Sequence, residues 1–253
     1  MNIFITGAAN GLGRELALHY LESGCRVYGV SIEDYSEEVF AKYAGKTFFF
    51  SKLSIGDFAA VAKSVEDCIN KFGSIDVLIN NAGLKFHRSP DSIKIDDYAN
   101  VLNTNLLAQI NIINLVIPSM IKNKSGTIIN IASRAAVEFS YVDGIAYGPS
   151  KAGFYSYSQL LAKYLESRKV SVHVLCPPTF STDDYKILHP ELNHNKFLSS
   201  KVVIKAIDDL VYAKSFITNK VIYFYSIKSW VRTVLSEIVK YVKLLPQVKY
   251  RWK

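Results

Sequence analysis

Short apolar runs alternate with longer amphipathic stretches along most of the chain. Runs such as Ile3–Ile5 are continuous, which is typical of strands buried on both faces of a sheet. Between them, apolar residues recur at helical spacing, as in Ile55–Phe72, which stops before Gly73. We predict strands at 3–5, 25–31, 46–51, 76–80, 126–132, 171–175 and 221–225, and helices at 12–21, 55–72, 96–121 and 147–168. This alternation predicts an α/β fold with a doubly wound parallel sheet.

The pattern changes near the C-terminal end. From Ile227 onward the apolar residues fall on one side of a helix, the basic residues lie off that stripe, and Pro246 ends it. We therefore predict a single α/β domain over residues 1–226, followed by a basic amphipathic C-terminal helix within the extension 227–253. This extension carries seven basic residues and one acidic residue, so it accounts for +6 of the net charge of +8.

A basic amphipathic helix with tryptophans and tyrosines nearby can lie on an anionic membrane surface. The ordinary alternative is that the stripe packs on the domain or on a second subunit. We expect no nucleic-acid partner, because the charge accompanies no motif that reads bases.

Composition adds few constraints. A hydrophobic fraction of 49% over 253 residues suits one core, and no run reaches about 18 uninterrupted apolar residues. Because a strand is predicted almost at the start, we expect no signal peptide and a cytoplasmic protein, with peripheral membrane contact through the tail as a further expectation. The three cysteines are far apart, and no histidines have ligand spacing except the loosely placed His189 and His194, so we expect reduced core thiols and no metal site.

A glycine-rich turn follows the first strand. Gly7, Gly11 and Gly13 have the spacing Gly-x-x-x-Gly-x-Gly, which differs from the commoner Gly-x-Gly-x-x-Gly fingerprint. Glycine permits a tight turn, and the amides at the start of the next helix favour a pyrophosphate. The turn therefore predicts a nucleotide site, with a purely structural turn as the alternative.

A second candidate site combines a tyrosine and a lysine. Tyr147 and Lys151 are four residues apart on a predicted helix, so they share one face, and Ser133 ends the preceding strand. A phenol ionises near pH 10, and a neighbouring ammonium lowers that pKa. The pair can act as a general acid or base near neutral pH. The alternative is a solvated surface pair.

Four motifs in order resemble those of the short-chain dehydrogenase/reductase family over about residues 1–185. They are Thr6–Gly13, Asn80-Asn81-Ala82-Gly83, Ser133 and Tyr147-x-x-x-Lys151. The resemblance implies a Rossmann fold and an NAD(P)-dependent oxidoreductase that transfers a hydride between the nicotinamide and a small carbonyl or alcohol substrate. A non-catalytic NAD(P)-binding sensor or scaffold of the same fold is the alternative.

The resemblance also implies individual roles. Tyr147 would be the general acid or base, Ser133 would hold the substrate oxygen, and Lys151 would bind the nicotinamide ribose while lowering the pKa of the tyrosine. Asn105 aligns with a fourth catalytic residue that positions a water; the alternative is a helix-capping or buried polar residue. The implied cofactor-binding residues are Gly7, Asn10, Gly11, Leu12, Gly13, Ser31, Asn81, Ala82, Gly83, Tyr147, Lys151 and Thr182.

Departures from the family pattern bear on the cofactor. Ser31 stands where an acidic residue would bind the ribose hydroxyls of NAD, which favours NADP over NAD. Acidic residues nevertheless follow closely, at Glu33 and Asp34. Pro178 replaces a usual glycine, and Lys52 replaces an aspartate beside the adenine; that lysine either helps a phosphate or is solvated. Members of the family are usually dimers or tetramers, so we expect a homodimer or a homotetramer.

Overall fold

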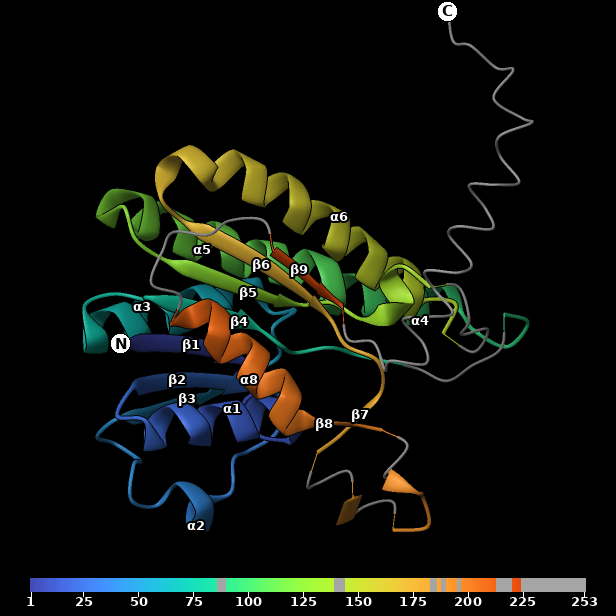
Figure 1. Cartoon of the computed structure of the whole chain (residues 1–253), viewed down its shortest axis with the longest axis horizontal. Coiled ribbons are helices and arrows are strands. Elements are labelled where there is room, and N and C mark those ends of the chain that lie inside the picture. The colour runs from blue at the N-terminus through green and yellow to red at the C-terminus, as the bar shows by residue number, and fades with distance from the viewer. Residues whose placement is uncertain are drawn as a thin grey trace, which may run out of the picture. The chain divides into compact units, whose positions relative to one another are not determined.

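The computed structural model describes residues 1–85, 90–138, 144–182, 186–187, 190–194, 197–212 and 220–223 (Figure 1). Seven strands form one sheet in the order β3-β2-β1-β4-β5-β6-β9. Each recorded pairing in the series from β3 to β6 is parallel. The strands are β1 Asn2–Thr6, β2 Arg26–Ser31, β3 Phe48–Lys52, β4 Val77–Asn80, β5 Thr127–Ile131, β6 Ser171–Cys176 and β9 Lys220–Tyr223.

Helices cover both faces of this sheet (Figure 1). One face is covered by α3, α5 and α6, of which α3 packs against α5, and α1 and α8 lie together on the other. The helices are α1 Gly11–Glu22, α2 Glu37–Phe40, α3 Phe58–Phe72, α4 Ile95–Leu102, α5 Ala108–Asn123, α6 Tyr147–Leu165 and α8 Ser200–Val211. The predicted doubly wound Rossmann fold is therefore confirmed.

Local sequence accounts for the best-predicted elements. All five residues of β1 are buried, as a continuous apolar run in a central parallel strand requires. Helix α3 begins where the side chain of Asp57 accepts a hydrogen bond from the amide of Ala60 at 3.0 Å, and it ends at Gly73 with φ of 85°. Its apolar stripe reaches the same core as α5 and α6.

The helix predicted over 96–121 is longer and less regular than its periodicity indicates. A π-helical segment, Asn103–Leu107, joins α4 to α5 and places one extra residue in the turn. The whole stretch Ile95–Asn123 is long and apolar enough to cross a membrane by length and composition alone. Its buried side chains instead lie in the core beside the sheet, which accounts for the hydropathy.

Some elements are absent from the sequence prediction. They are α2, α8 and a two-stranded parallel sheet of β7, Phe180–Ser181, and β8, Leu198–Ser199. A pair of two-residue strands is too short to show a period, so its pairing depends on the tertiary fold. The predicted extension 227–253 lies outside the described residues, so the boundary at residue 226 stays a prediction.

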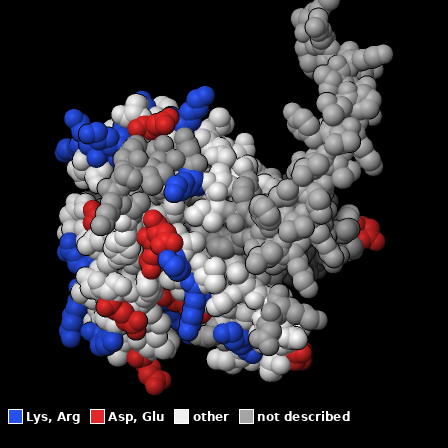
Figure 2. Space-filling model, viewed as in Figure 1, with Lys and Arg blue, Asp and Glu red and all other residues white. Residues whose placement is uncertain are grey.

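The three cysteines are free and buried, as the sequence predicts. Burial raises the pKa of Cys68 and of Cys176 to about 12, so both stay neutral thiols at pH 7. On the face shown in Figure 2, lysine and arginine side chains lie among acidic ones. His19 Nε2 on α1 lies 2.7 Å from Asp208 Oδ2 on α8.

Candidate active site

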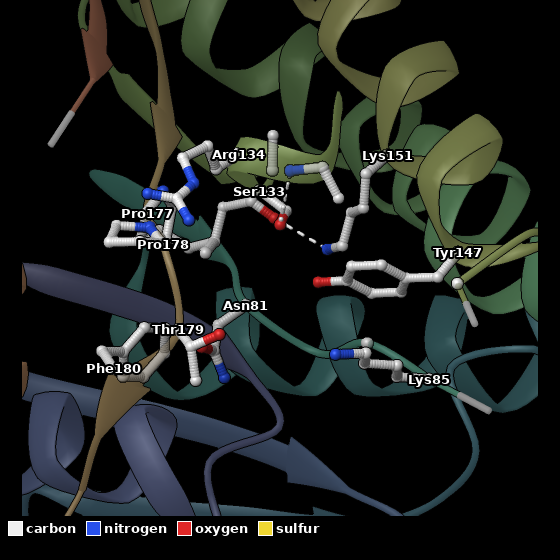
Figure 3. A pocket seen from close by; sticks show the side chains of 15 residues that line it. Asn81, Lys85, Ser133, Arg134, Tyr147, Lys151, Pro177, Pro178, Thr179 and Phe180 are labelled. Atoms are coloured by element: carbon white, nitrogen blue, oxygen red, sulfur yellow. Dashed lines mark hydrogen bonds between the residues drawn. The ribbon is translucent and has the colours of Figure 1, made fainter. Parts of the chain in front are cut away.

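A cavity of about 260 Å³ lies at the carboxyl ends of the parallel strands. Its lining comes from the segments that follow β4, β5 and β6 and from the start of α6 (Figure 3). This is the edge of a doubly wound sheet where ligands bind, because the connections diverge there. The cavity therefore brings together the segments after three strands and the first turns of α6, which are far apart in the sequence.

The glycine turn has the backbone that its sequence predicts. Gly7 and Gly11 adopt φ of 68° and 54°, in the left-handed region that disfavours side chains. A Cβ on Gly13 would lie 2.0 Å from the carbonyl oxygen of Gly7, so no side chain fits there. Leu12 and Gly13 follow Gly11 in the buried first turn of α1, and their position places the helix start beside the turn.

The end of β4 supports this turn. The hydroxyl of Thr6 accepts hydrogen bonds from the amides of Asn81 and Ala82, both at 2.9 Å. The side-chain amide of Asn81 donates in turn to the carbonyl oxygens of Thr6 at 3.0 Å and Gly7 at 3.4 Å. Asn81 therefore shapes the glycine turn in addition to lining the cavity.

Tyr147 and Lys151 face the cavity from the first turns of α6, and Ser133 faces it from the end of β5 (Figure 3). The Lys151 side chain is buried, with 3% of the residue exposed, and its Nζ donates to the carbonyl oxygen of Ile131 at 2.8 Å. That Nζ lies 5.8 Å from the centre of the Tyr147 ring. These contacts exclude the alternative in which Tyr147 and Lys151 form a solvated pair on the surface.

Burial sets the electrostatics of Lys151. Removing the ammonium from water lowers its pKa to about 8. The group therefore titrates far closer to neutrality than an exposed lysine does. Ser133 accepts a hydrogen bond from the amide of Ala135 at 3.1 Å, and this fixes the hydroxyl oxygen at the rim of the cavity.

Asn105 lies in the π-helical segment and is completely buried. Its Oδ1 accepts from the amide of Leu84 at 2.7 Å, and its Nδ2 donates to the carbonyl oxygen of Leu84 at 2.8 Å and to Ser150 Oγ at 3.0 Å. The side chain thus ties the segment after Gly83 to α6. It does not line the cavity, so its geometry matches a buried polar residue, and the water-positioning role stays a prediction.

Gly83 also belongs to this packing. A Cβ there would lie 3.4 Å from Lys151 Nζ and 3.5 Å from Asn105 Oδ1. Another pair of distant residues meets across the turn, since a Cβ on Gly11 would lie 4.0 Å from Thr182 Oγ1. Thr182 is buried, and Pro178, four residues earlier, lines the cavity.

The residues expected to select the cofactor lie at the end of β2. Ser31 is the last residue of that strand. The Asn10 side chain donates to the carboxylate of Glu33 rather than capping α1. Lys52 Nζ lies 2.6 Å from Asp34 Oδ2, with both side chains mostly exposed, so Lys52 belongs to a surface ion pair. A carboxylate thus lies beside Asn10 although Ser31 itself carries none.

The cavity contains residues that the sequence patterns do not single out. Lys85 and Arg134 line it, as do Thr179 and Phe180. Lys85 Nζ lies 5.6 Å from the centre of the Tyr147 ring, a distance similar to that of Lys151. The available signal was adjacency: Lys85 is two residues beyond the Asn-Asn-Ala-Gly motif, and Arg134 directly follows Ser133.

Comparisons with known proteins cover most of the chain. The family model described as short chain dehydrogenase matches residues 1–192. The short-chain dehydrogenase/reductase olcF of Penicillium canescens is 30% identical over 208 residues, which are 81% of this chain and 79% of that protein. The 3-oxoacyl-[acyl-carrier-protein] reductase FabG of Thermotoga maritima is 31% identical over 182 residues, covering 70% and 73%.

Solved structures share the fold. ElxO with NADP bound matches with a TM-score of 0.78 at 24% identity, over 87% of this chain and 95% of that one. Levodione reductase matches with a TM-score of 0.77 at 21% identity, over 87% and 94%.

Proposed function

The chain belongs to the short-chain dehydrogenase/reductase family and is an NAD(P)-dependent oxidoreductase, and from this premise we propose that Tyr147 is the general acid or base that acts on a carbonyl or alcohol substrate. The observation that carries the proposal is the buried ammonium of Lys151 next to the Tyr147 ring, inside a cavity at the carboxyl edge of the sheet. The family match favours this enzyme over a non-catalytic sensor or scaffold.

The side chains suit proton transfer. The ammonium of Lys151 lies close to the Tyr147 ring and favours the phenolate over the phenol. In the reductive direction Tyr147 gives its proton to the substrate oxygen, and the hydroxyl of Ser133 donates a hydrogen bond to the same oxygen. The nicotinamide supplies or accepts the hydride when it is bound.

Asn105 has a supporting part in this scheme. Its three hydrogen bonds hold Leu84 and α6 together, and these elements carry one wall of the cavity and the catalytic tyrosine. We propose that Asn105 keeps Tyr147 and the segment after β4 in register, with the water-positioning role as a further expectation from the family.

The residues around the glycine turn fit a dinucleotide. Gly7, Gly11 and Gly13 leave the backbone open for close approach of a pyrophosphate, and the helix start favours its charge. We propose that Asn10, Leu12 and Ser31 contact the adenosine side of the cofactor. The nicotinamide side would contact the following residues: Asn81, Ala82, Gly83, Tyr147, Lys151 and Thr182.

We propose NADP as the cofactor, with NAD less favoured. Ser31 places no carboxylate at the end of β2, and the similar ElxO structure holds NADP. Another structural neighbour, a 3-ketoacyl-(acyl-carrier-protein) reductase from Brucella melitensis, holds NADH, and Glu33 beside Asn10 opposes a 2′-phosphate. We favour NADP because Glu33 lies two residues beyond the end of β2, whereas the carboxylate that selects NAD lies at the strand end.

The cofactor proposal has a direct test. Ser31→Asp is expected to weaken NADPH binding at least tenfold, about 1.4 kcal/mol, because the new carboxylate repels the 2′-phosphate and accepts from the 2′-hydroxyl of NADH instead. Titration with NADPH and NADH, followed by nicotinamide fluorescence, gives both affinities. Ser156→Asp on the exposed side of α6 is the control for the added charge. If Ser31→Asp leaves the ratio of NADPH to NADH affinity unchanged, residues other than Ser31 select the cofactor.

The names of the relatives bear on which carbonyl substrate is reduced. Several are named 3-oxoacyl-[acyl-carrier-protein] reductase, so we propose that a small molecule with a 3-oxo group is reduced at this site. We also propose that the protein is cytoplasmic and that it forms a homodimer or a homotetramer. Light scattering of the purified protein tests the oligomeric state.

We propose that the extension 227–253 contacts anionic membranes peripherally, because its predicted basic helix has one apolar side. Packing on the domain or on a second subunit is the alternative. The full chain is expected to co-sediment with phosphatidylserine vesicles, and Lys240→Glu with Lys243→Glu is expected to lower the bound fraction at least fivefold, since each basic residue contributes about 1 kcal/mol. A full chain that never co-sediments would rule out the membrane proposal.

A further inference from the structure

The side chain of Asn10 is held away from the helix that it begins. Asn10 is the N-cap residue of α1, and its φ of −136° and ψ of 167° are the extended values typical of an N-cap. Asparagine is among the residues that cap helices best, yet in the described α1 its side chain makes no capping hydrogen bond. The side-chain amide donates instead to the carboxylate of Glu33, two residues beyond the end of β2.

Two other helices are capped by their own N-cap residues. Asp57 caps α3 and Ser199 caps α8, each by accepting a hydrogen bond from an amide of the first turn, at 3.0 Å and 3.3 Å. The difference at α1 is the nearby carboxylate. A hydrogen bond from an amide to a carboxylate is charge-assisted and about twice as strong as a neutral one, so the contact with Glu33 fixes the Asn10 side chain in its uncapped orientation.

The amides that a cap would occupy are the ones that a pyrophosphate needs. An N-cap side chain accepts from the second or third residue of its helix, which in α1 are Leu12 and Gly13. Amides in this first turn have no acceptor within the helix and are the groups that bind phosphate oxygens at a helix start. If Asn10 capped α1, that bond would have to break before a dinucleotide could bind.

We propose that Glu33 is a positioning residue for the cofactor, which holds the Asn10 side chain away from α1 so that the first-turn amides stay open to the pyrophosphate. This inference rests on the proposed function. It gives Glu33 two opposite effects: its carboxylate repels the 2′-phosphate of NADPH, whereas its contact with Asn10 favours the binding of NADPH and NADH alike. NADH isolates the contact because it has no 2′-phosphate.

A double-mutant cycle tests the contact. Glu33→Ala is expected to weaken NADH binding about fivefold, because the released Asn10 side chain then caps α1 with the usual strength of an asparagine N-cap. In an Asn10→Ala background, Glu33→Ala should change the NADH affinity by less than about twofold, since no side chain is left to cap the helix. Nicotinamide fluorescence measures NADH directly, and competition with NADPH measures it where binding is weak.

The matched control is Glu37→Ala. Glu33 and Glu37 are both exposed, and both lie in the segment after β2, so either variant removes the same side chain and charge without touching the core. We expect Glu37→Ala to leave the NADH affinity within about twofold of the wild-type value. Hydrogen exchange of the cofactor-free proteins gives a structural readout: the amide of Leu12 or Gly13 should exchange more slowly in Glu33→Ala and regain the wild-type rate in the double variant.

The opposite results are equally distinct. Glu33→Ala with wild-type NADH affinity, or with the same loss in both backgrounds, would show that Glu33 does not act through Asn10, and the proposal is wrong. A gain in NADPH affinity alone would leave Glu33 as a source of repulsion and nothing more. Failure of the proposed function looks different, because the wild-type protein would then bind neither NADH nor NADPH.

Discussion

Tyr147→Phe is expected to lower kcat by about 1,000-fold and to leave NADPH affinity within about twofold of the wild-type value. The substitution removes one hydroxyl and retains the ring that packs at the start of α6. Lys151 keeps its hydrogen bond to the carbonyl oxygen of Ile131, so the cofactor side of the cavity is preserved. The loss falls on kcat because a proton donor acts chiefly in the transition state. Steady-state oxidation of NADPH with a neutral 3-oxo ester measures it.

The matched control lies on the same helix. Tyr155→Phe also removes a phenol hydroxyl from α6, one that accepts a hydrogen bond from Gln159 at 3.1 Å and that does not line the cavity. We expect its kcat to stay within about twofold of the wild-type value. Turnover by Tyr147→Phe at more than about a tenth of the wild-type rate would assign the proton to another group.

Gly13→Ala is expected to weaken NADPH binding by about 100-fold or more, about 2.7 kcal/mol. Helix propensity alone would favour alanine by about 1 kcal/mol. Steric overlap outweighs this gain, because the new Cβ would lie 2.0 Å from the carbonyl oxygen of Gly7 and the turn must move. A displacement of this size misplaces the amides that face the pyrophosphate. Fluorescence titration with NADPH measures the loss, and circular dichroism checks that the protein is folded.

Gly24→Ala provides the comparison for this variant. Gly24 also has a positive φ, 80°, but a Cβ there meets no atom within 4 Å. Alanine at that position costs about 1 kcal/mol of backbone strain without touching the glycine turn. Its NADPH affinity should therefore equal that of the wild-type protein. A folded Gly13→Ala variant with normal affinity would show that the cofactor does not depend on this turn.

Continuous apolar runs made the sheet predictable. The runs around Phe4 and Leu78 are continuous because both faces of a central parallel strand are covered, so they needed no tertiary information. The predicted start of α6 at Tyr147 is also confirmed, and the Tyr147-x-x-x-Lys151 motif begins at the same residue. Ser133, Tyr147 and Lys151 meet at one cavity because Ser133 follows β5 and the other two lie in the first turns of α6, at the same edge of the sheet.

Other features depend on contacts that no local pattern encodes. Periodicity cannot separate an α-helix from one with a single π-turn, so the place of Asn105 in the π-turn was not predictable. Lys52 had two interpretations, and the position of Asp34 decided between them. No sequence pattern distinguishes Lys85, because a lysine after a motif is usually solvated. Its proximity to Tyr147 comes only from the fold of the segment after β4.

The small sheet of β7 and β8 has an evolutionary consequence. Phe180 pairs with Leu198, and Ser181 pairs with Ser199, so the chain leaves and re-enters the domain at two adjoining points; His194 adds a contact to Ser181 at 3.0 Å. Insertions, deletions or exchanges between these anchors need not disturb Thr182 at one end or α8 at the other. The segment between the two strands can therefore diverge in sequence over evolution faster than the residues on either side of it, because the β7–β8 pairing holds both of its ends.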